Sequence, residues 1–116
     1  HELIFKLQDL LEKGTQPRVV NVSSGAGSLQ ALKESPDMPM YRLTKYALGG
    51  MTILWAGILK GKVAVNALDP GWLKTDLGGP EAPGEPEDGG QRMWEICSLP
   101  WDETGKFWHG NQEIEF

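Results

Sequence analysis

The sequence predicts an α/β protein with a partial Rossmann-like parallel sheet of about three strands and flanking helices. Two short runs rich in β-branched and apolar residues, 18–23 and 63–68, are typical of strands buried on both faces of a sheet. Between them, residues 40–60 contain no proline and show a helical pattern that stops at Gly61. A strand, a helix and a strand in this order form a βαβ unit, whose strands are parallel and whose crossover is right-handed in about 98% of cases.

A further helix is predicted ahead of the first strand. Apolar residues recur there at helical spacing, and Gly14 follows where a helix C-cap is expected. These apolar residues are Leu3, Ile4, Leu7, Leu10 and Leu11. In the helix of residues 40–60, by contrast, apolar side chains occupy most of the circumference of the helix. A helix of this kind is normally buried on more than one side. One face of it is expected to cover the sheet, and another to meet a second helix or a second subunit.

The remaining segments have a loop-rich composition. Residues 25–39 read as a loop in which residues 29–34 can form one turn. Residues 78–90 are rich in glycine and proline, which predicts a mobile loop. A third helix, 87–98, is expected to bring three side chains inward, namely Met93, Trp94 and Ile96. Residues 106–116 form either a last strand with a polar tail or a small hairpin.

Composition narrows the class of protein and the class of partner. The chain has 116 residues, 40% apolar and 23% charged, which is typical of one soluble globular domain. The net charge of −5 comes without a basic cluster, so we expect no nucleic acid partner. No stretch approaches the roughly 20 apolar residues of a membrane span, and no signal peptide is recognisable. Cys97 is the only cysteine, which favours a reducing compartment and hence a cytoplasmic protein.

Tyr41 and Lys45 are one turn apart at the start of the long helix, so their side chains leave the same face. An ammonium near a phenol favours the phenolate. Such a pair suits a group that must donate and accept a proton at neutral pH. The alternative is an ordinary surface pair on a helix.

Two turns are expected to open onto one crevice. Ser23 and Ser24 end the first predicted strand and Asp69-Pro70-Gly71 ends the second, and open α/β sheets bind ligands at the carboxyl ends of their strands. A serine hydroxyl there can hold a substrate oxygen, or it can simply cap its neighbours. Trp72 follows the second turn and either lines the crevice or adds apolar mass to the core.

Two other motifs are not assigned a catalytic or ligand-binding role. Gly25-Ala26-Gly27 is not followed by the full G-x-G-x-x-G pattern or by a clear helix, so we reject a phosphate loop there. The lone His109 is interpreted as a structural or exposed imidazole. No cysteine or histidine partner stands at metal-ligand spacing, so no metal is assigned.

Three motifs together resemble the short-chain dehydrogenase/reductase family. In chain order they are Asn21-Val22-Ser23-Ser24, Tyr41-x-x-x-Lys45 and Val65-Asn66-Ala67-x-x-Pro70-Gly71-x-x-x-Thr75. The resemblance implies that Ser24 polarises the substrate oxygen, that Tyr41 donates or accepts the proton, and that Lys45 holds the nicotinamide ribose. It also implies that a second group lies close to the cofactor, namely Pro70, Gly71, Trp72 and Thr75. The implied reaction is hydride transfer between NAD or NADP and a small-molecule carbonyl or alcohol.

The resemblance covers the C-terminal half of the family's fold. The Gly-rich turn, the residue that chooses between NAD and NADP and the Asn-Ala-Gly strand of the family have no counterpart in residues 1–116. We therefore interpret the chain as the C-terminal half of an NAD(P)-binding Rossmann domain that lacks the N-terminal dinucleotide-binding half. By itself, this chain is expected to bind the cofactor weakly.

Two functions follow from this interpretation. The chain is either a truncated reductase, inactive or weakly active alone, or a non-enzymatic interaction module that has lost cofactor binding. In both cases the strand of residues 18–23 leaves an uncovered parallel edge, which native proteins cover or charge. We expect a homo-oligomer, formed either through the helices of residues 3–11 and 40–60 or by pairing along residues 18–23.

Overall fold

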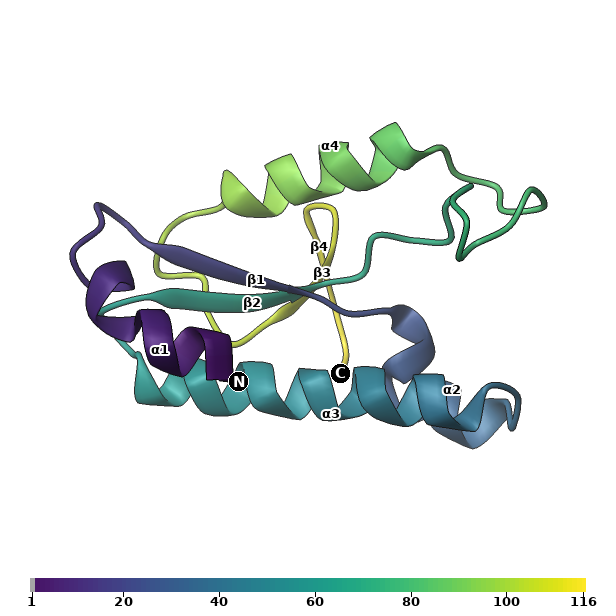
Figure 1. Ribbon diagram of the computed structural model, residues 1–116, viewed down its shortest axis with the longest axis horizontal. Coiled ribbons are helices and arrows are strands. Elements are labelled where there is room, and N and C mark those ends of the chain that lie inside the picture. Colours follow the sequence, from purple (N-terminus) through teal and green to yellow (C-terminus); the bar gives the residue numbers. More distant parts are fainter. Residues whose placement is uncertain (1) are drawn as a thin grey trace.

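A computed structural model describes residues 2–116 of the chain. The elements in chain order are α1 (Glu2–Leu11), β1 (Arg18–Val22), the 3-10 helix η1 (Gly25–Gly27), α2 (Leu29–Glu34), α3 (Pro39–Ile58), β2 (Ala64–Leu68), α4 (Pro86–Cys97), β3 (Phe107–His109) and β4 (Gln112–Ile114). Figure 1 shows three layers, with α4 on one face of the sheet and α1, α2 and α3 on the other. The predicted α/β class is confirmed.

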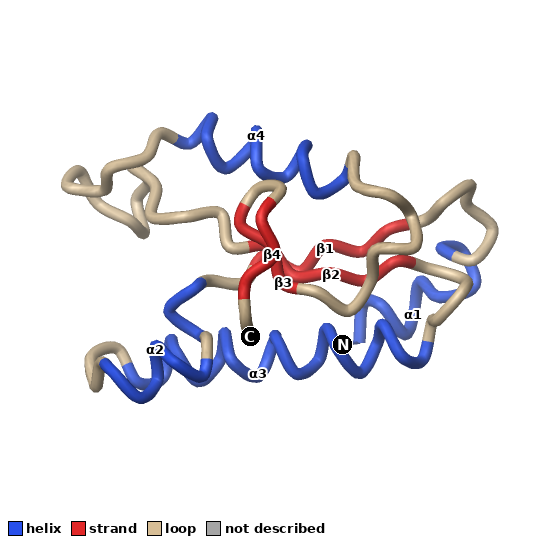
Figure 2. The backbone as a smooth tube through the Cα atoms, turned by 180° about the vertical axis from the view of Figure 1, so that it is seen from behind, coloured by secondary structure: helices blue, strands red, loops and turns tan. Residues whose placement is uncertain are grey.

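The sheet has the strand order β1-β2-β3-β4. The first three strands are parallel, as predicted, and β4 returns antiparallel to β3 (Figure 2). The end of the chain is therefore the hairpin, one of the two alternatives, and the described sheet is mixed. Gly110 adopts φ +62° in the hairpin turn, a conformation that favours glycine.

Two apolar clusters hold the layers together. All five residues of β2 are buried, as expected of a central strand covered on both faces. The cluster between the sheet, α1 and α3 contains Ile4, Trp55, Ala56, Leu59, Val63 and Val65. The cluster on the α4 side contains Leu68, Ile96 and Trp108. The sheet is thus held by helices on both of its faces.

The structure corrects the orientation of one helical side chain and shows where the last helix begins. Trp94 was expected to point inward, but 70% of its surface is exposed. A helix on a sheet buries one stripe of side chains, and Trp94 lies about 100° round the helix from the partly buried Met93. Residues 86–90, part of the predicted loop 78–90, form the start of α4, where Asp88 Oδ2 accepts a hydrogen bond from the backbone N–H of Glu85 at 2.8 Å. The mobility of the remaining loop stays a prediction.

The apolar surface of α3 divides into two faces. One face is buried and holds Gly49, Thr52, Trp55 and Ala56, with Phe116 of the C-terminal segment against Gly49. On the other face Leu54 and Ile58 are 62% and 63% exposed. The prediction that α3 covers the sheet is confirmed, and Ile4 of α1 shares a core cluster with Trp55 of α3, as the alternative of a second helix predicted. Contact of α3 with a second subunit stays a prediction.

Candidate active site

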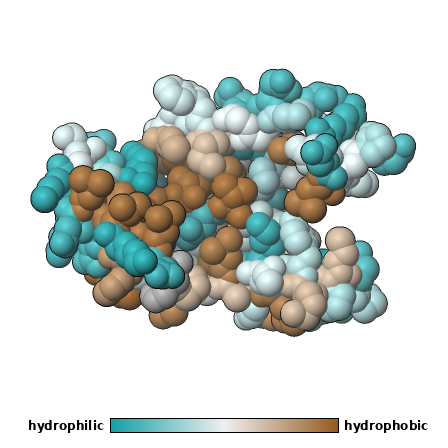
Figure 3. All heavy atoms as spheres, in the orientation of Figure 1, coloured by the Kyte–Doolittle hydropathy of each residue, from teal (hydrophilic) through white to brown (hydrophobic). Residues whose placement is uncertain are grey.

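The carboxyl ends of β1 and β2 open between two parts of the molecule. On one side lie α4 and the loop of residues 72–85, and on the other lie η1, α2 and the start of α3 (Figure 1). The space-filling view shows the surface indented between these two parts (Figure 3). This is the place where open α/β sheets hold their ligands.

Tyr41 and Lys45 meet at the edge of this indentation. Tyr41 lies in the first turn of α3, and the Lys45 Nζ lies 5.7 Å from the centroid of its ring, within cation–π range. The same Nζ donates a hydrogen bond to the carbonyl oxygen of Val22 at 2.9 Å. Both side chains are half-buried. The pair that the sequence singles out is therefore formed, and it sits at the end of β1.

The carbonyl that Lys45 contacts faces the open edge of the sheet. The backbone N–H of Ser23 donates to Leu68 across the β1–β2 pair at 2.7 Å, so the backbone groups of Ser23 point toward β2. Because successive residues of a strand alternate, the carbonyl of Val22 points the other way. The Lys45 ammonium consequently lies beside the free edge of β1.

Ser24 begins the turn that follows β1. Its Oγ accepts a hydrogen bond from the backbone N–H of Ala26 at 3.2 Å, which is the local capping role given above as the alternative. A hydroxyl that accepts one bond retains its own hydrogen for donation to another group. Local capping and binding of a substrate oxygen are therefore compatible at Ser24.

The turn of Ser24 is packed directly on α3. Buried Ser23 donates its hydroxyl to the backbone carbonyl of Lys45 at 3.2 Å. A methyl group added at Gly27 would lie 2.6 Å from the Cβ of Lys45, so η1 and α3 approach as closely as glycine allows. On its other side, a methyl group added at Gly25 would lie 3.2 Å from the Oδ2 of Asp69. The turn thus joins the helix of Tyr41 and Lys45 to the end of β2.

The same turn is not a phosphate loop. Its backbone N–H groups donate within the turn, from Ala26 to the Ser24 hydroxyl and from Gly27 and Ser28 to the carbonyls of Ser24 and Gly25. A phosphate loop directs such groups at its ligand. The geometry agrees with the rejection of this motif from the sequence.

Asp69, Pro70 and Gly71 form the expected turn at the end of β2. Gly71 has φ +81°, and its N–H donates to the carboxylate of Asp69 at 3.1 Å. The carbonyl of Pro70 accepts a hydrogen bond from Arg92 Nη1 of α4 at 2.5 Å. The turn is therefore held from both the sheet and α4.

His109 is not isolated, because its Nδ1 lies 3.1 Å from the Oδ2 of Asp69. Asp69 follows β2 and His109 ends β3, so the two groups meet at the carboxyl ends of adjacent parallel strands. This pair is not predicted by the sequence pattern. The signal was present in the positions of both residues at strand ends, but its interpretation required β3 to lie beside β2.

Trp72 and Thr75 make their contacts within their own loop. Trp72 is 59% exposed and donates its indole N–H to the carbonyl of Gly78 at 2.8 Å. The hydroxyl of Thr75 accepts a hydrogen bond from the N–H of Gly78 at 3.1 Å. The contacts of the described residues do not join either side chain to Tyr41 or Lys45, and their role toward a cofactor stays a prediction.

Residues 2–116 contain neither a metal-binding cluster nor a membrane-spanning helix. They hold no group of three or more His, Cys, Asp or Glu side chains arranged to bind a metal ion. None of the helices described is both long enough and apolar enough to cross a bilayer.

Comparison with known proteins identifies the family. The family model of short chain dehydrogenases matches residues 3–86. Carbonyl reductase [NADPH] 1 of Sus scrofa is 35% identical over 78 residues, which are 63% of this chain and 27% of the pig protein. The Macaca fascicularis protein of the same name is 39% identical over 88 residues, covering 72% of this chain and 31% of the relative.

Solved structures agree in fold over nearly the whole chain. The carbonyl reductase Sniffer of D. melanogaster matches with a TM-score of 0.86 at 28% identity, and the NADPH-bound carbonyl reductase from chicken fatty liver with 0.85 at 26%. Each match covers 98% of this chain and 51% of the other, so the chain spans about half the length of these structures. Since the family model matches well over half of its residues, the chain belongs to the short-chain dehydrogenase family.

Proposed function

We propose that this chain carries the carbonyl-binding and proton-transfer residues of an NAD(P)H-dependent carbonyl reductase. The observation that carries the proposal is the position of the Lys45 ammonium, 5.7 Å from the Tyr41 ring, on a helix packed against the turn of Ser24. The names of the relatives, carbonyl reductases with NADPH, support the same reaction class.

The donor set fits the nicotinamide end of a dinucleotide. An ammonium and a phenol suit a ribose hydroxyl, and the backbone of the turn after β2 suits the flat ring beside it. The residues proposed to hold the cofactor are Tyr41, Lys45, Pro70, Gly71, Trp72 and Thr75. When bound, the nicotinamide supplies the hydride.

The residues of this chain supply the proton and hold the oxygen. The Ser24 hydroxyl donates a hydrogen bond to the carbonyl oxygen and stabilises the negative charge that develops on it. The Tyr41 phenol gives its proton to the same oxygen, so the carbonyl π bond breaks as an O–H bond forms. The Lys45 ammonium stabilises the phenolate left on Tyr41. In the direction of alcohol oxidation the same proton returns to Tyr41.

We also propose that residues 1–116 act as the C-terminal half of an NAD(P)-binding Rossmann domain in the cytoplasm, with residues 78–90 bordering the substrate. The open edge of β1 and the coverage of 51% of the solved relatives support this division. The exposed apolar side chains of α3 favour the second candidate function, an interaction module that associates with another copy.

The enzymatic proposal predicts that Tyr41→Phe abolishes turnover. In an assay of NADPH oxidation with a simple aromatic aldehyde, we expect the rate to fall at least about 100-fold, the usual minimum contribution of a positioned proton donor. Tyr46→Phe is the matched control, because Tyr46 is the other tyrosine of the chain, lies on the same helix and is exposed. This variant should keep the wild-type rate.

Two results would contradict the proposal. Equal rates in Tyr41→Phe and the wild type would remove the assigned proton donor. Tight NADPH binding by the wild-type chain in a fluorescence titration would contradict the proposal that these residues are only the C-terminal half of the cofactor-binding domain.

A further inference from the structure

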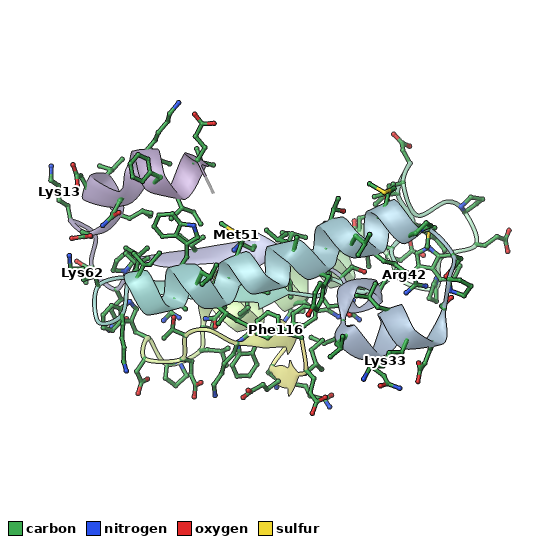
Figure 4. The ribbon with its side chains drawn as sticks, turned by 90° about the horizontal axis from the view of Figure 1, so that it is seen from below. Lys13, Lys33, Arg42, Met51, Lys62 and Phe116 are labelled. Atoms are coloured by element: carbon green, nitrogen blue, oxygen red, sulfur yellow. The ribbon has the colours of Figure 1, made fainter. Side chains whose placement is uncertain are left out.

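Arg42 is a nearly buried charge directly after Tyr41. Only 8% of its surface is exposed, and Figure 4 shows it at the beginning of α3. A guanidinium in such a place costs free energy unless its donors are paired. The partners of Arg42 therefore indicate what it holds together.

The guanidinium uses all three of its nitrogen atoms on two segments. Nη1 donates to the carbonyl of Ala26 at 3.1 Å, inside η1 and two residues after Ser24. Nε donates to the carbonyl of Asp37 at 2.7 Å, and Nη2 to the carboxylate of the same residue at 2.6 Å. One side chain thus connects the turn of Ser24 with the loop that leads into α3.

The start of α3 depends on this connection. Met38 stands at the N-cap in the left-handed conformation, φ 47° and ψ 49°, and makes no side-chain cap hydrogen bond. Asp37, just before it, is held by Arg42 from within the helix and by the hydroxyl of Ser35. The direction in which α3 begins, and with it the place of Tyr41, is therefore set by Arg42 and not by an ordinary cap.

The other contacts of the turn lie one helical turn further along. Ser23 and Gly27 contact α3 at Lys45. The Arg42 bond to Ala26 is the contact nearest to Tyr41 in sequence. Without it, we expect the turn of Ser24 to remain attached near Lys45 but to tilt away from Tyr41.

We propose that Arg42 is a positioning residue that fixes the separation of Ser24 and Tyr41. The proposal rests on the proposed function, because the distance between Ser24 and Tyr41 matters only if both residues bind the same substrate oxygen. Being buried, Arg42 acts through the backbone of two segments and does not touch the substrate. Lysine cannot replace it, since an ammonium is a point charge and lacks the planar fork that reaches both segments.

Hydrogen exchange on the wild-type chain and its variants tests the connection without any activity. In Arg42→Met we expect protection of the amides of 26–28 and 42 to fall together, by about tenfold or more. Arg18→Met is the matched control, because Arg18 also donates to a backbone carbonyl, that of Leu99 at 2.7 Å, from the far end of β1. It should leave these amides protected. Unchanged protection of 26–28 in Arg42→Met would overturn the proposal.

Steady-state kinetics separate positioning from plain stabilisation. In Arg42→Lys, with a melting temperature near that of the wild type, we expect kcat to fall about tenfold while KM for NADPH stays the same, because small displacements of reacting groups are costly. If the loss of kcat in Arg42→Lys is no larger than the loss of folded protein, the positioning role is overturned. If Tyr41→Phe turns over as fast as the wild type, the proposed function fails, and hydrogen exchange still decides whether Arg42 connects the two segments.

Discussion

At the scale of single residues, two cations at the start of α3 have different tasks. Lys45 is half-buried, and its flexible ammonium carries three donors, of which the structure assigns one to the carbonyl of Val22. Arg42 is buried, and its three nitrogen atoms all bond to the protein. A ligand that enters between Ser24 and Tyr41 is therefore expected to meet Lys45, while Arg42 keeps the walls of the site in place.

The partner of Arg42 predicts a pH dependence of stability. Hydrogen bonds from Ser35 and then from Arg42 lower the pKa of Asp37. A carboxyl whose pKa is lower in the folded protein stabilises the fold above its unfolded pKa of about 3.9, and this contribution is lost as the pH falls through the folded value. Asp37→Asn should therefore lower the free energy of unfolding at neutral pH, with a difference from the wild type that shrinks on acidification below about pH 4.

Urea unfolding at neutral and acid pH measures this difference. Because the Asp37 side chain is 59% exposed, we expect a small effect that added salt reduces further. Asp76→Asn, at an exposed position in the loop after β2, serves as the control and should leave the free energy of unfolding at neutral pH near that of the wild type. A difference between Asp37→Asn and the wild type that grows toward acid pH would show that the sign of this linkage is wrong.

At the scale of elements, the site depends on how closely η1 approaches α3. A methyl group at Gly27 would lie 2.6 Å from the Cβ of Lys45 and 2.8 Å from the backbone nitrogen of Tyr46. These atoms belong to a helix backbone and cannot move aside easily. Gly27→Ala should therefore push the turn of Ser24 away from α3 and destabilise the fold by about 1–3 kcal/mol, as overpacking does.

Gly50→Ala is the matched control for Gly27→Ala. Gly50 lies on α3, and a methyl group there would have no neighbour within 4 Å. Alanine inside an exposed helix is favoured over glycine by about 1 kcal/mol, so this variant should be as stable as the wild type or slightly more stable. Equal melting temperatures for Gly27→Ala and Gly50→Ala would argue against the close approach.

The elements also show which features can be predicted from the sequence. The runs of Val19–Val22 and Val63–Leu68 mark strands by composition alone, but only β2 is buried throughout, because β1 lies at the edge of the sheet and Val22 is 46% exposed. Tyr41 and Lys45 face one another because helical spacing is a local rule. Arg42 could not be found in this way. Its partners, Ala26 and Asp37, belong to irregular segments whose course depends on the tertiary structure.

The dependence on tertiary structure also explains the other two features that the sequence did not predict. The pairing of Asp69 with His109 depends on which strand lies beside β2, and no local pattern states this. The outward position of Trp94 depends on the rotation of α4 over the sheet, which the short apolar pattern of that helix leaves open. Contacts within one helix are thus predictable here, while contacts between elements are not.

At the scale of the whole molecule, the chain exposes more surface than its mass requires. Its accessible surface is 7352 Å², whereas a compact monomer of 12.8 kDa is expected to expose about 6,300 Å². The radius of gyration of 14.4 Å likewise exceeds the roughly 13 Å expected for this length. Figure 3 shows apolar side chains gathered over α1 and β1, and Leu3, Phe5 and Leu10 of α1 are exposed. The excess of about 1,000 Å² is similar to the area that each partner buries in a typical stable interface.

This surface predicts self-association through the exposed faces of α1 and α3. Sedimentation velocity of the wild-type chain over a wide range of concentrations should show a dimer that dissociates on dilution. Leu54→Glu and Ile58→Glu place charges on the exposed face of α3 without disturbing the core, and each should shift the equilibrium to the monomer. Leu77→Glu is the control, because Leu77 is exposed in the loop after β2, away from both helices, and this variant should associate like the wild type.

A wild-type chain that stays monomeric at every concentration would rule out this association. A dimer that persists in Leu54→Glu and Ile58→Glu would place the contact on another surface, and the open edge of β1 is the next surface to test.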